Sequence, residues 1–204
     1  MRHPDEDQGR FAEEMRTLLA ERVSIGAVAA ACVYPFFIVE DVRLAPDQWE
    51  RMATLRLISS IFFMFLFGLS KTGVGERHPY KVAVFGLLTA GLLKTILNPA
   101  EVQGAGSLYF GGHALMIVGA LGLLPLSFWR ALVLGGVTQL SFTVPTALFA
   151  DPIDHVAFAM QNMLMLTMLL LLSLSCHLNY NMHFREFQLR SRLYAVRQRA
   201  TEYG

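Results

Sequence analysis

The sequence predicts an all-α membrane protein, a bundle of six transmembrane helices with an amphipathic amino-terminal helix and a carboxy-terminal cytoplasmic coiled-coil stalk. Of the 204 residues, 54% are hydrophobic and 16% are charged, which is too apolar a composition for an ordinary soluble domain. Six apolar stretches have about the 17–25 residues that crossing a bilayer requires. They are residues 24–40, 54–70, 81–98, 106–125, 130–150 and 155–177.

The distribution of Lys and Arg predicts that both termini lie in the cytoplasm. Positive residues favour the cytoplasmic side of a membrane protein. With the amino terminus inside, thirteen fall on inner segments: Arg2, Arg10, Arg16, Arg22, Lys71, Arg77, Lys81, Arg130, Arg185, Arg190, Arg192, Arg197 and Arg199. The outer connections hold only Arg43 and Arg51, with several acidic residues. The chain is therefore expected to be a multi-pass membrane protein, and the polar residues 1–22 are not expected to form a signal peptide.

Three regions are expected: an amino-terminal segment (1–23), the transmembrane bundle (24–177) and a cytoplasmic signalling helix (178–204). Within residues 8–22, one helical face is apolar, which indicates a helix lying on the inner leaflet or against the bundle. That face contains Phe11, Met15, Leu18 and Leu19. A solvated tail that frays is the alternative. The longest outer connection is expected over residues 41–53, and the other connections are short.

Beyond Cys176 the sixth span is expected to continue as a helix into the cytoplasm. Apolar residues there follow heptad-like steps among polar neighbours, which is typical of a parallel two-stranded coiled coil. They are Met182, Leu189, Leu193, Val196, Ala200 and Tyr203. We expect a homodimer through this stalk, leading to an effector domain beyond Gly204; the alternative is a complete small membrane protein with a polar tail.

His113 is the strongest candidate ligand, because ionisable side chains within membrane spans are costly and often functional. It lies inside the fourth span among glycines, and His155 opens the sixth span on the same outer side. One metal, such as a bis-histidine haem iron, could be held between these two helices. His113 could instead only hydrogen-bond a neighbouring helix, and His155 could be an ordinary interfacial histidine.

A second pair of histidines is expected at the inner face. His78 precedes Pro79 at the start of the third span, and His177 ends the sixth. The 22 residues from His155 to His177 correspond to about 33 Å of helix, so one cofactor cannot contact both. Two cofactors on opposite leaflets fit this spacing, and His183 could replace His177.

Two cationic side chains, Arg56 and Lys94, lie near the outer ends of the second and third spans. They could extend to the interface or pair with carboxylates, for example haem propionates. Cys32 and Cys176 are expected to be free thiols. No nucleotide-binding loop, catalytic triad, zinc motif or nucleic-acid-binding patch is recognisable, so this chain itself is not expected to be an enzyme.

Several short motifs resemble the six-span input domains of bacterial membrane signalling proteins. They are the stretch TLRLISSI at 54–61, the acidic turn before His155-Val156, and the sixth span that runs into a cytoplasmic helix. One branch comprises α-hydroxyketone quorum-sensing histidine kinases; the other comprises class III adenylyl cyclases with a tetra-histidine, diheme-b anchor. The Leu-Arg-Leu-Ile stretch and the spacing from His155 to His177 are similar to the kinases, whereas His78 and His113 favour the cyclases. The resemblance covers most of residues 24–190.

The resemblance to the cyclase anchors implies a function in signal input. It implies that His78, His113, His155 and His177 are axial ligands of b-type haem, two in number, and that quinone or quinol is the redox partner. The expected protein is then a redox sensor in the bacterial cytoplasmic membrane that controls an attached adenylyl cyclase. The second interpretation is a receptor for a small lipophilic autoinducer whose ketone or hydroxyl is hydrogen-bonded inside the bundle. The third is a structural anchor that only dimerises.

Overall fold

The computed structural model describes residues 4–44, 46–47, 49–97, 110–149 and 155–202, and these residues are helical apart from short turns. Within them, four stretches are long and apolar enough to cross a membrane: Gly9–Arg43, Trp49–Ser70, Phe128–Leu148 and His155–Tyr194. Two further apolar helical stretches, Pro79–Leu92 and Gly112–Leu123, are shorter. The all-α prediction is confirmed. Where six full-length spans were predicted, the described residues contain four helices long enough to cross a membrane and two shorter apolar helices.

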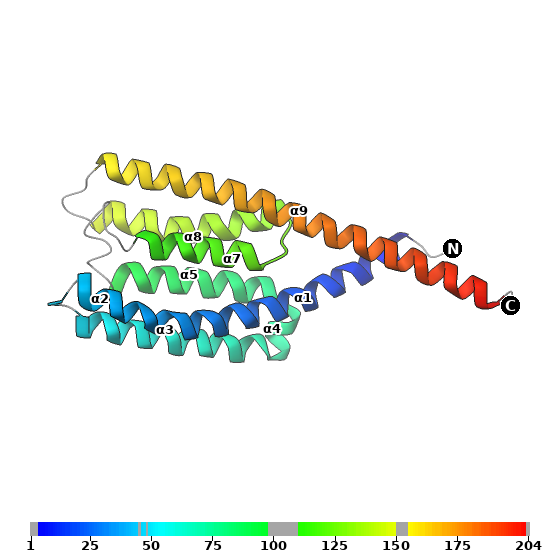
Figure 1. Cartoon of the computed structure of the whole chain (residues 1–204), viewed down its shortest axis with the longest axis horizontal. Helices are drawn as coiled ribbons and strands as arrows, with labels where there is room; N and C mark the ends of the chain where they lie inside the picture. The colour runs from blue at the N-terminus through cyan, green and yellow to red at the C-terminus, as the bar shows by residue number, and fades with distance from the viewer. Residues whose placement is uncertain (1–3, 45, 48, 98–109, 150–154, 203–204) are drawn as a thin grey trace.

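The helices run up and down a long bundle, and both termini lie at the same end (Figure 1). In chain order the elements are α1 (Pro4–Val33), the 3-10 helix η1 (Tyr34–Phe37), α2 (Ile38–Leu44), α3 (Trp49–Ser70), α4 (Gly73–Arg77), α5 (Pro79–Leu97), α7 (Phe110–Leu123), α8 (Phe128–Phe149) and α9 (His155–Glu202). The ends of α1 and α9 project together beyond the bundle.

The amino-terminal segment and the first span form one helix, where the sequence predicted a separate lead-in helix over 8–22. Nothing in residues 10–33 interrupts α1, because the first proline after it is Pro35. Proline lacks the N–H that would continue the α-helical ladder, and the backbone tightens there into η1. The predicted outer connection over 41–53 is also largely helical, since α2 extends to Leu44 and α3 begins at Trp49.

The connection between α3 and α5 is a capped turn. The hydroxyl of Thr72 accepts a hydrogen bond from the backbone N–H of Gly75 at 3.3 Å, which caps the short helix α4. Helix α5 then begins at Pro79, as predicted, because proline is well suited to a first helical turn. His78 lies between these two helices and is exposed.

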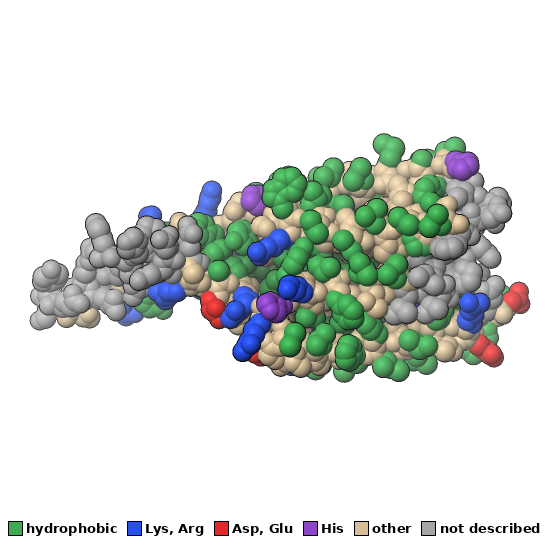
Figure 2. All heavy atoms as spheres, turned by 180° about the vertical axis from the view of Figure 1, so that it is seen from behind, with side chains coloured by type: hydrophobic (Ala, Val, Ile, Leu, Met, Phe, Trp, Pro, Cys, Tyr) green, Lys and Arg blue, Asp and Glu red, His purple; other side chains and the backbone are tan. Residues whose placement is uncertain are grey.

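Two apolar clusters hold the bundle together. One joins α5, α7, α8 and α9 and includes Ile117, Leu134 and Met165; the other joins α1, α3 and α5 around Phe63 and Leu66. In a bilayer, such packing depends on close contact rather than on removal of apolar surface from water. The outer surface is itself rich in hydrophobic side chains, while Lys and Arg gather mainly where the bundle narrows (Figure 2). Such a surface is compatible with a membrane protein.

An aromatic cluster attaches the amino-terminal part of α1 to α9. The ring of Phe11 lies 4.8 Å from that of Phe184 and 5.5 Å from those of Tyr180 and Phe187, measured between centroids. Phe11, Met15 and Phe187 are buried together. The apolar face predicted for residues 8–22 therefore packs against a helix of the same chain.

Helix α9 is continuous over 48 residues, from His155 to Glu202. The helix thus continues past the predicted sixth span. Four residues of the predicted coiled-coil seam are exposed in the isolated chain: Met182 by 59%, Leu189 by 60%, Leu193 by 70% and Val196 by 64%. Tyr203, the last residue of that seam, lies outside the described residues. The seam and the Phe11 cluster occupy different faces of α9, because the seam residues are exposed whereas Phe187 is buried.

Candidate functional site

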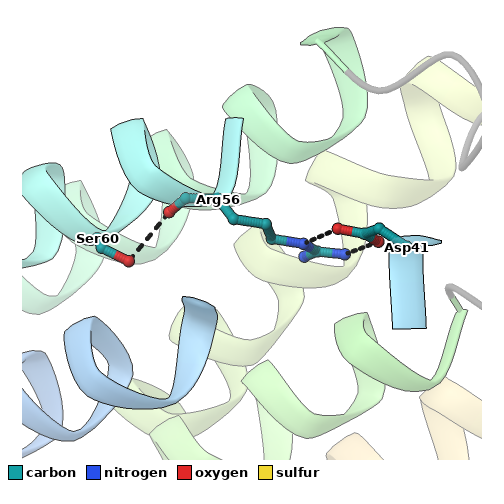
Figure 3. A network of polar contacts seen from close by, with 3 residues as sticks. All are labelled: Asp41, Arg56 and Ser60. Carbon is teal, nitrogen blue, oxygen red and sulfur yellow. Dashed lines mark hydrogen bonds and ion pairs between the residues drawn. The ribbon is translucent and has the colours of Figure 1, made fainter. Parts of the chain in front are cut away.

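A buried ion pair lies at the end of the bundle opposite the projecting ends of α1 and α9. The guanidinium of Arg56 donates two hydrogen bonds to the carboxylate of Asp41, from Nε to Oδ2 at 3.1 Å and from Nη2 to Oδ1 at 3.2 Å (Figure 3). Asp41 is fully buried and Arg56 is 8% exposed. A two-point contact of this kind is the strong, planar form of the arginine–carboxylate interaction. Arg56 therefore pairs with a carboxylate of its own chain, where the sequence left interface or cofactor partners open.

The local fold explains how this pair meets. The bend at Pro35 turns the chain through η1 into α2, and α2 brings Asp41 to Arg56 on the second turn of α3. The same bend places two aromatic rings against the guanidinium, with Cζ of Arg56 5.1 Å from the ring centroid of Tyr34 and 5.4 Å from that of Phe37. These cation–π contacts further compensate a charge held away from water.

An apolar groove of about 360 Å³ leads away from Arg56 between α1, α3, α5 and α7. Its walls combine small residues of α1, α5 and α7 with larger apolar residues from all four helices. Among them are Gly26, Ala27, Ala30, Phe63, Gly119 and Ala120. Tyr34, Phe37 and Arg56 line one end and Arg22 lines the other. The helical path from Arg22 in α1 to Tyr34 at the start of η1 is a rise of twelve residues, about 18 Å. Ligand-binding sites are usually concave, apolar and of this size, with few polar groups.

His113 is buried between α7 and α8. It is 1% exposed, and its Nε2 lies 3.0 Å from the backbone carbonyl oxygen of Thr138. Its ring stacks obliquely on Phe142, with 5.0 Å between centroids. This is the helix-packing arrangement that the sequence left open beside ligation.

The structure does not bring His113 and His155 together. The thiol of Cys176 donates to the backbone oxygen of Leu121 at 2.7 Å, which fixes the relative register of α7 and α9. Both helices run in the same direction, so His113, eight residues before Leu121, lies level with about residue 168 of α9. His155 lies thirteen residues before that level, at the start of α9, which is a separation of about 20 Å along the helix, and its side chain is exposed. Bis-histidine ligation needs both rings on one iron, and this arrangement does not place these two histidines at matching depth.

His78 and His177 lie near the same end of the bundle but not at the same helix–helix interface. Tyr80, two residues after His78, donates through its hydroxyl to the backbone oxygen of Arg130 at 3.1 Å. The ring of His177 lies 6.4 Å from that of Phe128, at the same end of α8. Helix α8 packs against both α5 and α9, which lie on its two sides (Figure 1). His78 and His177 are thus not brought to one point.

The surroundings of the remaining candidates are simpler. His177 is half-buried, its Nε2 lies 3.1 Å from Nδ2 of Asn181, and its buried Nδ1 has no hydrogen-bond partner among the described residues. His183 lies beside Glu186, 3.7 Å from Nδ1 to Oε2. Lys94 lies in α5, but its side chain is outside the described part of the structure. The part of the chain that the structure describes contains no cluster of three or more His, Cys, Asp or Glu side chains suited to a metal.

A polar cluster between α8 and α9 lies away from the groove. Nε2 of Gln139 donates to Oδ1 of Asn162 at 2.8 Å and to the hydroxyl of Thr143 at 2.9 Å. Thr143 also donates to Oδ1 of Asn162 at 2.5 Å. These contacts fix the packing of two neighbouring helices. Cys32 and Cys176 are free thiols, as predicted.

Comparison with known proteins identifies no relative. No protein-family model, curated protein or solved structure matches this chain. The functional assignment therefore depends on the chain's own residues.

Sequence reasoning missed the partner of Arg56 and the groove. Asp41 was assigned to a polar outer connection, although the cost of an arginine in a span should have prompted a search for the nearest carboxylate. The groove depends on small residues of α1 and α7, which a sequence pattern cannot distinguish from tight helix packing. Pro35 was the available signal for the bend that places both Tyr34 and Asp41 beside Arg56.

Proposed function

We propose that this chain is the membrane-embedded input domain of a signalling protein and acts as a receptor for a small lipophilic molecule. The observation that carries the proposal is α9, one helix that begins at the outer end of the apolar bundle and extends past its inner end. A rigid helix that joins an apolar, ligand-accessible region to a polar segment suits signal transfer across a membrane. The groove beside Arg56 supplies a place for the ligand.

The proposal includes six membrane crossings with both termini in the cytoplasm. Its support is the thirteen-to-two distribution of Lys and Arg together with the common end of the two termini. The two short apolar helices, α5 and α7, would then complete the set of six with the residues that connect them.

We further propose that two copies associate in parallel through the exposed seam of α9. Changing both Leu189 and Leu193 to Glu is expected to weaken dimerisation of the full chain in detergent or nanodiscs by about tenfold or more, because charges would enter an apolar contact. Mass photometry over a concentration series measures this. The matched control is Tyr194→Glu, which is also exposed, by 66%, but lies off the seam. Equal dimerisation of all three proteins would place the interface in the spans.

Haem b binding is the second candidate, and the buried Nδ1 of His177 without a partner among the described residues is the observation that favours it. His78, His113, His155 and His177 would have to meet in pairs, which this arrangement does not provide. Sensing of the quinone pool and control of an adenylyl cyclase stay predictions from the resemblance.

If the chain binds haem b, the purified protein should be coloured. Chain purified from haem-competent cells should show a Soret band and the dithionite-sensitive α and β bands of low-spin bis-histidine haem. His177→Ala should lower haem per chain from about two to about one, because iron would lose an axial ligand. Asn181→Ala, which removes only the neighbour of His177, serves as the control. A colourless preparation with intact helical circular dichroism would contradict haem binding and leave the receptor.

A further inference from the structure

We infer that the groove between α1, α3, α5 and α7 binds one acyl chain of an anionic glycerophospholipid, and that Arg22 binds the phosphate of its headgroup. The inference deepens the proposed receptor function, on which it rests, by naming the class of lipophilic molecule. Arg22 lines the end of the groove that is nearer to the projecting ends of α1 and α9, and it is half-buried there. Basic sites between membrane helices on the cytoplasmic side bind anionic lipid headgroups.

The positive charge of Arg22 has no counter-ion within the described part of the chain. Its side chain forms no hydrogen bond or ion pair there, whereas Arg16 of the same helix pairs with Glu13. Lys81, the residue before Val82 of the groove lining, is a second exposed cation without a carboxylate partner among the described residues. Lys and Arg gather where the bundle narrows (Figure 2). A phosphate at Arg22 would supply the missing negative charge, and arginine suits phosphate because it can donate two parallel hydrogen bonds to it.

The two ends of the groove differ in charge balance, and this difference sets the orientation of the lipid. At the far end, the guanidinium of Arg56 already donates two hydrogen bonds to the carboxylate of Asp41. A phosphate there would have to compete with a buried carboxylate and would add negative charge to an apolar region, which is costly. The phosphate therefore belongs at Arg22, with the acyl chain directed toward Tyr34. The proposed topology places this headgroup in the cytoplasmic leaflet.

The groove has the lining and the length for one acyl chain. Between its two ends the lining is apolar and includes Ala27, Phe63 and Leu66. Its length of about 18 Å is close to half the thickness of the hydrocarbon core of a bilayer, about 15 Å. A Cβ atom added at Gly119, another lining residue, would meet no atom within 4 Å, so open space adjoins this glycine. One chain from one leaflet therefore fits along the groove.

A photoreactive phospholipid tests the inference. The probe is phosphatidylglycerol with a diazirine in one acyl chain, added to the full chain in micelles of a neutral detergent. We expect saturable labelling of α1 and α7 near Ala27 and Gly119. Unlabelled phosphatidylglycerol should compete at a mole fraction about tenfold lower than phosphatidylcholine with the same acyl chains, because each cation near the headgroup favours the anionic lipid by about fivefold.

One pair of variants tests the headgroup contact. Arg22→Gln should lower the preference for phosphatidylglycerol over phosphatidylcholine by about fivefold, because one cation near the phosphate is lost. Arg10→Gln is the matched control, since it removes an exposed cation from the same helix but outside the groove lining. This control should keep the preference within about twofold of that of the unchanged chain.

A second pair of variants locates the acyl chain. Gly119→Leu should reduce labelling of α1 by about tenfold or more, because its side chain enters the groove. Gly122→Leu places the same side chain on the same helix, also into open space, but outside the groove lining, and should leave labelling within about twofold of the unchanged chain. Circular dichroism of each variant checks that its helices are intact.

The opposite results each overturn a stated part. Equal competition by the two lipids would mean that an acyl chain fills the groove without recognition of its headgroup, and an unchanged preference in Arg22→Gln would remove Arg22 from the site. Equal labelling of the two glycine variants would remove the groove. Displacement of the probe by glycerol phosphate, which has no acyl chain, would show a site for free phosphate instead of a lipid. Absence of saturable labelling anywhere would contradict phospholipid binding, while the dimerisation test of the signalling role would be unaffected.

Discussion

Replacing Asp41 with alanine is expected to lower the free energy of unfolding by about 3–5 kcal/mol, because Arg56 would keep its charge in a buried position without the carboxylate that compensates it. The two hydrogen bonds at 3.1 and 3.2 Å would be lost together. Reversible unfolding in mixed micelles of increasing dodecyl sulfate content, followed by circular dichroism, measures the change.

A double variant separates the ion pair from simple loss of packing. Asp41→Ala combined with Arg56→Met removes both charges, so the combined loss should be smaller than the sum of the two single losses. The control is Glu50→Ala, an exposed acidic residue in the first turn of α3, with an expected change within about 0.5 kcal/mol. If Asp41→Ala were no more destabilising than this control, the ion pair would not stabilise the outer end of the bundle.

Phe11→Ala is expected to release the amino-terminal part of α1 from α9. Phe11 is 5% exposed and contacts the rings of Tyr180, Phe184 and Phe187, and removing a buried phenylalanine commonly costs about 3–5 kcal/mol. The loss should be local, since the cluster lies at the end of the bundle. Hydrogen–deuterium exchange of residues 8–20 should rise strongly, while exchange in α8 should not change.

Glu14→Ala is the matched control for this change. Glu14 lies on the next turn of α1 and faces Arg190 of α9 at 3.7 Å, but both side chains are more than half exposed. A solvent-exposed pair of this kind contributes about 0–1 kcal/mol, so exchange of residues 8–20 should barely change. Equal protection in the Phe11→Ala variant would mean that α1 is held by other contacts.

The elements that follow local rules were predictable. The start of α5 at Pro79 and the start of α9 at His155 follow from proline chemistry and from the beginning of an apolar run. The apolar face containing Phe11 was also evident from helical spacing, although its partner was not. These features depend on neighbours in sequence, which a single chain displays directly.

The features that depend on distant neighbours were not predictable. The depth of His113 relative to His155 is fixed by the register between α7 and α9, for which the contact from Cys176 to Leu121 is the evidence. Helix ends in a sequence can be placed only to within a few residues, and each residue shifts the depth by 1.5 Å. The pairing of Arg56 with Asp41 likewise depends on the bend at Pro35.

The unbroken course of α9 gives it a mechanical property. Its 48 residues correspond to a rod of about 72 Å. If the rod pivots at its outer end, a tilt of about 3° carries the far end sideways by roughly 4 Å, nearly the width of a side chain, with no hydrogen bond of the helix broken. The contact between Phe11 and Phe184 attaches a second helix, α1, to α9. A displacement too small to notice near the pivot is thus geometrically amplified at the opposite end of the molecule.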